Sequence, residues 1–242
     1  LGYQAGLVPG GTVYGYMTSQ LLEYVGEAWL TDGCMAVSFR KPVFAGETQR
    51  IEASLEEDDS VIHINVVDPE GDVCVSGKAS MNRYEPAIHD SGHDLANTPI
   101  AAYRAMPNQK QPAARQSFEQ ERVLGSIFAT FANKRAAEFL RQMQDHHHIY
   151  QHGTTHPAWL LRQANIIVDQ NIAVGPWIHT ASQIQNFGLA TNDEPFEVRA
   201  QVIDLFEKKS HQYVDLDVVM LAEGDPERLI CRVMHRAIYK MG

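Results

Sequence analysis

The sequence contains one dense group of side chains that could carry out acid–base chemistry. Residues 144–156 read QDHHHIYQHGTTH, in which five of the thirteen residues are histidine. Imidazole titrates near neutral pH and also binds transition metals, so such a stretch could move protons, hold a metal ion or form a polar loop. Asp145 is the second residue of the stretch and His156 is the last. A carboxylate followed by imidazoles makes acid–base chemistry the sharper hypothesis.

A metal site in this stretch has weaker support. Adjacent histidines point in different directions, so the run 146–148 is not expected to give three ligands to one ion. His148 and His152 have the spacing of a shared helical face, but Gly153 and the threonines after it favour a loop. We therefore expect no metal and no cofactor.

The spacing of apolar residues predicts the helices that position these side chains. The spacing predicts an amphipathic helix over 133–145, directly before the histidine stretch. It predicts a second, mostly apolar helix over 156–172, with Pro157 in its first turn. A third helix is expected within 7–30, after the glycines of that segment.

Short alternating or apolar runs, bounded by turns rich in Gly, Asp and Pro, predict strands in both halves of the chain. These strands are expected over 34–44, 48–57, 60–68, 72–84, 123–132, 177–187, 196–209, 211–222 and 228–240. The order in each half is therefore a helix followed by an antiparallel meander.

The two halves repeat one pattern at a nearly constant offset. Pro9 and His156 begin equivalent helices 147 residues apart, and Ala45 and Thr191 begin equivalent turns 146 residues apart. Such an offset indicates an internal duplication. We expect an α+β fold of two repeats, each a long central helix wrapped by an antiparallel sheet. The repeats are placed at 1–84 and 117–242, with 85–116 as a linker.

These patterns resemble the hotdog fold and, within it, the MaoC-like hydratase and dehydratase family. Residues 145–150 are similar to the family's D-x-N-P-[LI]-H motif, and 155–157 are similar to its A-H-G helix start. In the first half, the segments LGYQAGLVPGGTVYGYM and FRKPVFAGETQRIEASL are similar to two further family segments. The resemblance covers most of the chain outside the linker and implies a double hotdog.

The resemblance also implies an activity, the addition of water to an acyl-CoA or another acyl thioester, or its removal. Asp145 keeps the family's acidic group, whereas Tyr150 stands where the family has its partner histidine. In the first half, Pro9 replaces the histidine before glycine, and the upstream motif is absent, as expected if the start of that repeat is missing. Catalysis is therefore expected in the second repeat, with the first shaping an acyl tunnel.

Hydration of an enoyl thioester needs a base for water, an acid for the α-carbon and a donor for the carbonyl oxygen. Asp145 is the candidate base, and His148 or His156 is the candidate second proton carrier. Tyr150 could donate a hydrogen bond, and an unpaired backbone N–H at the helix start near His156 is expected to hold the enolate oxygen. The structural alternative is that Asp145 caps, and His156 fixes, that helix start.

Candidate substrate contacts lie in both halves. Pro157 and Trp159 begin the second central helix. His179 could face the acyl pocket or be a hydrogen-bonded strand histidine. Arg40 and Lys41 could meet CoA phosphates or be solvated charges.

Two other functions stay open. One is an acyl-CoA thioesterase, in which Asp145 or a glutamate activates water at the carbonyl carbon. The other is a non-catalytic acyl-CoA-binding protein, which Pro9 and Tyr150 in place of histidines would suit.

The composition of the chain limits the classes of partner that it is expected to bind and the cellular compartment in which it is expected. The formal net charge is −10, and an acidic surface repels nucleic acid. No apolar run approaches the roughly 20 residues of a membrane span. The three cysteines form no C-x-x-C pair, which favours a reducing compartment. We expect a cytoplasmic protein that binds an acyl thioester, neither nucleic acid nor membrane, and that could form a homodimer.

Overall fold

The structure is a computed structural model that describes residues 6–56, 60–82, 97–224 and 227–242. Its helices are α1 (Gly10–Val25), α2 (Trp29–Asp32), α3 (Arg115–Gln120), α4 (Asn133–Met143), α5 (His148–Gln151) and α6 (Pro157–Asn171). Its strands are β1 (Cys34–Phe39), β2 (Arg50–Leu55), β3 (Ile62–Val67), β4 (Val73–Ser80), β5 (Gln111–Pro112), β6 (Ile127–Thr130), β7 (Ile172–Ala173), β8 (Ile178–Asn186), β9 (Pro195–Lys208), β10 (His211–Ala222) and β11 (Arg228–Lys240).

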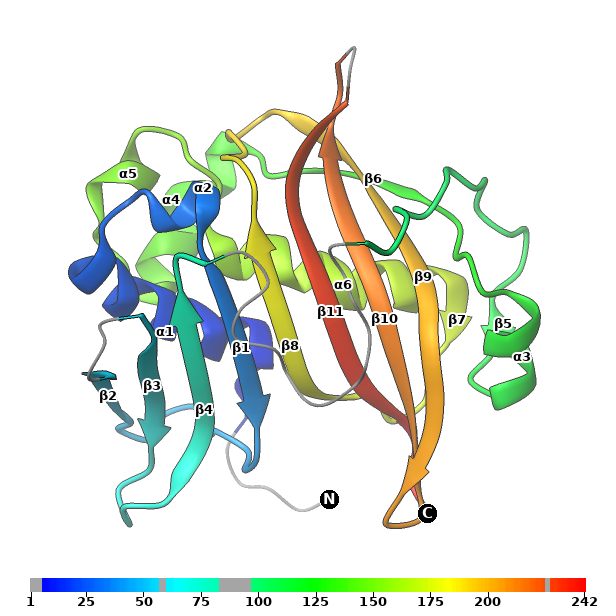
Figure 1. Cartoon of the computed structure of the whole chain (residues 1–242), viewed down its shortest axis with the longest axis horizontal. Helices are drawn as coiled ribbons and strands as arrows, with labels where there is room; N and C mark the ends of the chain where they lie inside the picture. Colours follow the sequence, from blue (N-terminus) through cyan, green and yellow to red (C-terminus); the bar gives the residue numbers. More distant parts are fainter. Residues whose placement is uncertain (1–5, 57–59, 83–96, 225–226) are drawn as a thin grey trace.

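Nine strands form one antiparallel sheet in the order β2-β3-β4-β1-β8-β11-β10-β9-β6 (Figure 1). The group β2-β3-β4-β1 is followed by β8-β11-β10-β9, which is the same order reversed. The two groups meet where β1 pairs with β8, from Cys34 opposite Gln185 to Ser38 opposite Ala181. This arrangement confirms the expected α+β fold of two sheet-wrapped helices.

The long helices α1 and α6 lie against each other on one face of the sheet (Figure 1). Val13, Met17 and Leu21 of α1 are buried, as their helical spacing predicts. Gly15 allows the close approach, because a Cβ there would lie 2.8 Å from the Cβ of Ala158. Both helices are largely apolar, yet no helix in the described segments is long and apolar enough to cross a bilayer.

The boundaries of two elements differ from the prediction. The helix expected within 7–30 is divided, because Gly26 adopts φ +73° and its N–H caps the end of α1 at the Leu22 carbonyl. The strand expected over 123–132 is regular only in β6, and Val123 adds one isolated bridge to Gln201 of β9.

The expected linker lies partly outside the described residues, at 85–96. Its described part, 97–116, contains the two-residue strand β5 and the beginning of α3. Strand β5 pairs in parallel with β7, which directly follows α6.

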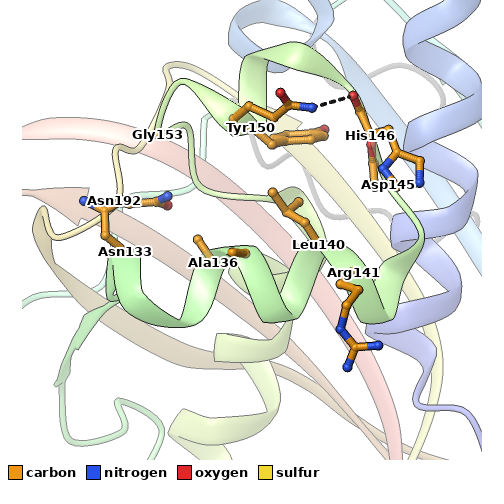
Figure 2. A pocket seen from close by; sticks show the side chains of 11 residues that line it. Asn133, Ala136, Leu140, Arg141, Asp145, His146, Tyr150, Gly153 and Asn192 are labelled. Carbon is orange, nitrogen blue, oxygen red and sulfur yellow. Dashed lines mark hydrogen bonds between the residues drawn. The ribbon is translucent and has the colours of Figure 1, made fainter.

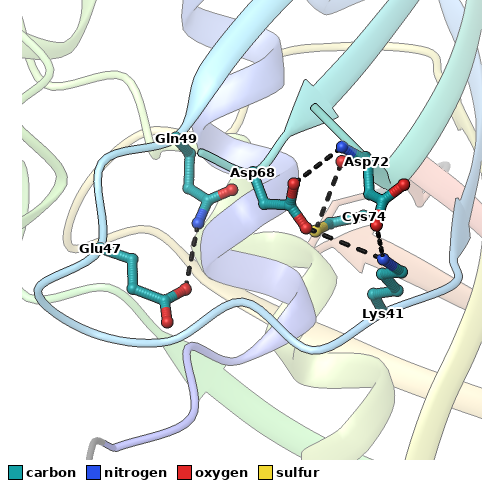
Figure 3. Close-up of polar contacts among 6 residues, drawn as sticks. All are labelled: Lys41, Glu47, Gln49, Asp68, Asp72 and Cys74. Atoms are coloured by element: carbon teal, nitrogen blue, oxygen red, sulfur yellow. Dashed lines mark hydrogen bonds and ion pairs between the residues drawn. The ribbon is translucent and has the colours of Figure 1, made fainter. Parts of the chain in front are cut away.

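The turn between β3 and β4 forms as its Asp-Pro-Glu-Gly-Asp sequence predicts, with Gly71 at φ +92°. The Asp68 carboxylate accepts hydrogen bonds from the Asp72 N–H at 2.8 Å and from the Cys74 thiol at 3.6 Å (Figure 3). The Lys41 ammonium forms an ion pair with Asp72 and lies 3.9 Å from Asp68. Lys41 therefore has two carboxylates of its own repeat as neighbours.

Candidate active site

The histidine stretch is folded between the end of α4 and the start of α6. After α4, Gln144 adopts φ +54°, which reverses the chain so that the Asp145 N–H reaches the Leu140 carbonyl at 3.1 Å. The stretch was expected to be a loop, but it contains the single helical turn α5. One cause is local: the Asp145 carboxylate accepts the His147 N–H at 2.9 Å, which satisfies a backbone donor just before α5. Gly153, at φ +93°, then turns the chain toward α6.

Asp145 and His156 form a buried hydrogen-bonded pair. His156 Nε2 lies 3.1 Å from Asp145 Oδ2, and the two side chains are 0% and 1% exposed, respectively. His156 Nδ1 accepts the Ala158 N–H at 3.1 Å, so it carries no proton in this arrangement. The proton of a neutral His156 therefore sits on Nε2 and is donated to Asp145. The imidazole thus caps α6 and orients the carboxylate at the same time.

The two acidic groups of this region are held in opposite protonation states. Burial alone would raise the pKa of Asp145, but the hydrogen bonds from His156 and from the His147 N–H outweigh it and lower the pKa. Burial, reinforced by the charges of Asp145 and Glu27, raises the pKa of the Tyr150 hydroxyl far above its ordinary value. At neutral pH the carboxylate is ionised and the phenol keeps its proton.

A cavity of about 420 Å³ lies between α4, α5 and the turn after β8 (Figure 2). This volume is within the range of small-molecule sites. Its lining combines apolar side chains of α4 with polar groups from both α4 and the other segments. The lining residues are Asn133, Ala136, Ala137, Leu140, Arg141, Asp145, His146, Tyr150, Gln151, Gly153 and Asn192.

Tyr150 lies beside Asp145 in this cavity. Figure 2 shows its hydroxyl directed toward the end of the cavity where Asp145 and His146 lie. The ring packs against His156, with centroids 4.6 Å apart. The hydroxyl is buried and has no hydrogen-bond partner among the described residues. A buried hydroxyl without a partner is uncommon, and here it leaves one donor available to a ligand.

The structure brings together only some of the residues that the sequence singled out. Asp145 and Tyr150 line the cavity, and His156 contacts Asp145 from behind. His148 does not line the cavity: its side chain is 70% exposed and its Nε2 lies 2.9 Å from Glu27.

The expected free backbone N–H at the start of α6 is absent, so that expectation was wrong. Pro157 has no N–H, and the Ala158 N–H is bonded to the His156 side chain. The Trp159 N–H donates to the His156 carbonyl at 3.0 Å. The physical reason is that the His156 side chain caps the helix and so occupies a backbone N–H that a ligand would otherwise bind.

The candidate substrate contacts lie outside the lining of this cavity. Pro157 is buried, and Trp159 packs against aromatic rings of the core. His179 lies on β8, with its ring 4.4 Å from the ring of Phe39. Arg40 and Lys41 are exposed in the first repeat.

Several lining residues were not found from the sequence. Asn133 and Asn192 come from a helix start and a turn that are distant in sequence, so no local pattern connects them. Ser19 of α1, which comes from the other repeat, also helps to lower the pKa of Asp145. Ala136 and Leu140 did carry a signal, since their i, i+4 spacing places them on one face of α4.

Comparison with known proteins identifies the fold of this chain. No known family profile and no curated protein sequence matches the chain. Among solved structures, it is similar to a conserved hypothetical protein from Mycobacterium tuberculosis described as a double hotdog, with a TM-score of 0.59, 13% identity, and 98% of this chain and 83% of the other covered. The chain has a double hotdog fold.

Two further structures share the double hotdog arrangement of this chain. One is a putative MaoC domain protein dehydratase from Chloroflexus aurantiacus, with a TM-score of 0.60, 9% identity, and 100% of this chain and 85% of the other covered. The other is a putative thioesterase II from Thermobifida fusca, with a TM-score of 0.54, 13% identity, and 99% and 89% covered. At these identities the likeness establishes the double hotdog architecture and not the reaction.

Proposed function

We propose that this double hotdog protein is an acyl-thioester hydratase or dehydratase whose reaction takes place in the cavity beside Asp145. The observation that carries the proposal is a carboxylate beside a hydroxyl that has no hydrogen-bond partner within the described segments. Asp145 and Tyr150 both line one cavity of about 420 Å³, one able to accept a proton and the other able to donate a hydrogen bond.

In the hydration direction, Asp145 accepts a proton from water while the water oxygen bonds to the β-carbon of the enoyl thioester. The π electrons move onto the thioester carbonyl, giving an enolate whose oxygen accepts a hydrogen bond from Tyr150. The enolate then takes the proton back from Asp145 at the α-carbon, which restores the carboxylate. Dehydration is the reverse sequence.

His156 is a positioning residue in this scheme. Its Nε2–H holds one oxygen of Asp145 at 3.1 Å, and the His147 N–H holds the other at 2.9 Å. These bonds set the direction of the carboxylate before substrate arrives, which reduces the reorganisation needed in the transition state. Tyr150 takes over the donor role that was expected of a backbone N–H at the start of α6.

Incubation with crotonyl-CoA and longer enoyl-CoAs, followed at the enoyl absorbance band, tests the proposal. We expect Asp145→Asn to lower kcat by at least about 100-fold, because the base is lost. Tyr150→Phe is expected to lower kcat by about 10- to 100-fold, because the enolate loses a donor. His152→Asn is the matched control, since this exposed histidine of the same stretch is outside the cavity lining.

A second readout separates this reaction from its rivals. A thiol dye reports release of free CoA, and thiol release without loss of the double bond would assign the cavity to thioester hydrolysis. Acyl-CoA binding without either reaction, unchanged in Asp145→Asn, would make the chain a binding protein and overturn the proposal.

A further inference from the structure

Three potential metal ligands converge at the contact between the two repeats, outside the cavity. Glu27 lies in the turn after α1, and His147 and His148 lie at the start of α5. Glu27 Oε1 is 2.9 Å from His148 Nε2 and 3.8 Å from His147 Nδ1. All three ligand atoms lie within 4.8 Å of one another.

Adjacent histidines can contribute to one site here because they use different ring nitrogens. The rings of His147 and His148 are stacked, with centroids 5.0 Å apart and planes at 24°. His147 turns Nδ1 toward Glu27, whereas His148 reaches the same carboxylate with Nε2. The run of histidines therefore supplies two ligands, and the first repeat supplies the third.

Two of these atoms lack a hydrogen-bond partner in the described part of the chain. His147 Nδ1 and Glu27 Oε1 are buried and have no hydrogen-bond partner among the described residues. The short approach of Glu27 to His148 does not have the geometry of a hydrogen bond. Buried polar atoms are almost always paired, so two such atoms facing each other indicate that something else satisfies them.

We propose that Glu27, His147 and His148 form a site for a divalent transition-metal ion of the Zn²⁺ class. Imidazole nitrogen and carboxylate oxygen bind Zn²⁺ at about 2.0–2.2 Å, which places tetrahedral ligands roughly 3.4 Å apart. The distances of 2.9 and 3.8 Å from Glu27 Oε1 to the two histidine nitrogens bracket this value, so small side-chain adjustments close the site. Three protein ligands leave a fourth position for water. Calcium and magnesium prefer all-oxygen sets and are not expected to bind.

The backbone around the three ligands is already fixed. The His147 N–H donates to Asp145 at 2.9 Å, and the His148 carbonyl accepts a hydrogen bond from His152 Nδ1 at 2.8 Å. The Glu27 carbonyl accepts the Leu30 N–H at 2.9 Å in the turn that leads into α2. Such outer contacts orient ligands before the ion binds.

The ion would join the end of α1 to the segment that carries Asp145 and Tyr150. It would therefore link the first repeat to the second at a point beside the cavity. This inference is independent of the proposed reaction, because it rests on different atoms and is tested by binding rather than by turnover.

The test uses chain without an affinity tag, treated with a chelator and then titrated with Zn²⁺ in competition with a chromogenic chelator. We expect one tight site per chain, weakened at least 10-fold in Glu27→Gln, His147→Asn and His148→Asn. Co²⁺ should give a visible absorption band that these variants lose. The melting temperature should rise with Zn²⁺ in the wild-type chain, because the ion binds only the folded state.

Two matched variants control for histidines that bind metal weakly. His146→Asn removes a neighbour in the same run that is outside the cluster, and His63→Asn removes a histidine whose Nε2 lies 2.6 Å from Glu56. Both should keep Zn²⁺ affinity within about twofold. Glu27→Gln decides the test, because it preserves side-chain volume and its fold can be checked by the melting temperature without metal. Zn²⁺ affinity unchanged in Glu27→Gln, or lowered equally in His146→Asn, would mean an adventitious ion only and would overturn the site.

Discussion

The starts of α1 and α6 occupy equivalent places in the two repeats, yet they are completed by different side chains. At α6, His156 accepts the Ala158 N–H and is itself held by Asp145. At α1, the residue before the helix is Pro9, and no side chain of the described residues caps the first turn. The α6 start is thus closed by polar side chains, whereas the α1 start has no side-chain cap in the described part of the chain.

The surroundings of the two starts also differ in charge. Beside α1, His179 Nδ1 lies where a Cβ on Gly10 would approach to 2.9 Å. His179 Nε2 contacts the Ser182 hydroxyl at 2.7 Å, and that hydroxyl lies 3.0 Å from His235 Nδ1. Burial lowers the pKa of His235 to about 3 and also lowers that of His179, to which the neighbouring His235 contributes. One start therefore lies beside neutral imidazoles and the other beside an ionised carboxylate.

The duplicated backbone therefore does not determine which side chains surround the start of its central helix. Both repeats present a helix start to the sheet, and at the second the described residues combine it with an ionised carboxylate and the cavity beside Asp145. The few side chains around a helix start can therefore differ between two copies of one backbone.

Removing His156 should have the largest effect. His156→Ala deletes the cap of α6 and leaves the buried Asp145 carboxylate without its side-chain partner, at a cost of roughly 3 kcal/mol in the free energy of unfolding. Urea unfolding measures this loss. His148→Ala, at an exposed position of the same stretch, should change it little in metal-free buffer. A loss below about 1 kcal/mol would show that the pair is not a structural element of the second start.

The buried histidines beside the start of α1 should make the free energy of unfolding decrease at acidic pH. The pKa of His235 falls from 6.5 to about 3 on folding, so below pH 6.5 the unfolded chain binds a proton that the folded chain does not. The lowered pKa of His235 has almost no effect on the free energy of unfolding at pH values well above 6.5. As the pH falls, this free energy decreases, by about 2 kcal/mol between pH 7 and pH 5. The groups facing His235 are His179, Ser182 and Trp177. In His235→Asn, urea unfolding at both pH values should show a smaller loss, and an unchanged loss would contradict the assignment.

Filling the contact between the two helices should have an intermediate effect. A Cβ at Gly15 would lie 2.8 Å from Ala158 and 3.0 Å from His156, so Gly15→Ala forces α1 away from the start of α6. We expect a loss of about 1.5 kcal/mol in the free energy of unfolding. At Gly11 the nearest atom would be 3.5 Å away, so Gly11→Ala should be neutral or slightly stabilising. Equal effects of the two substitutions in thermal unfolding would rule out a tight contact at Gly15.

Giving α1 a cap should have the smallest effect. Pro9→Ser places a hydroxyl before the first turn of α1, where no side-chain cap exists. Compared with Pro9→Ala, it should stabilise the chain by about 0.5–1 kcal/mol. The difference in melting temperature between the two variants measures the cap alone, because both lose the same proline ring. No difference would mean that the first start is already satisfied in another way.

The double hotdog architecture was predictable because its signals are local and repeated. Each strand is a short alternating run between turn residues, and the offset from Pro9 to His156 matches the two residues that precede α1 and α6. Asp145 and Tyr150 could be selected as candidate site residues because they lie close together in sequence.

Other parts of the site depend on contacts that a linear pattern does not contain. Glu27 approaches His147 only because α1 and α6 pack against each other, a contact between residues more than one hundred positions apart. The donor expected at the start of α6 was lost because the same imidazole that marked the site in the sequence turned back onto the backbone.

The pairing of β1 with β8 has a consequence for how the chain can be divided. Each of these strands has its other neighbour within its own repeat, β4 or β11, so cutting the chain between the repeats would expose one long edge on each fragment. An exposed edge with unpaired backbone groups recruits another strand. Fragments produced separately should therefore associate, with themselves or with each other, and the covalent connection between the repeats acts as a safeguard against that mispairing.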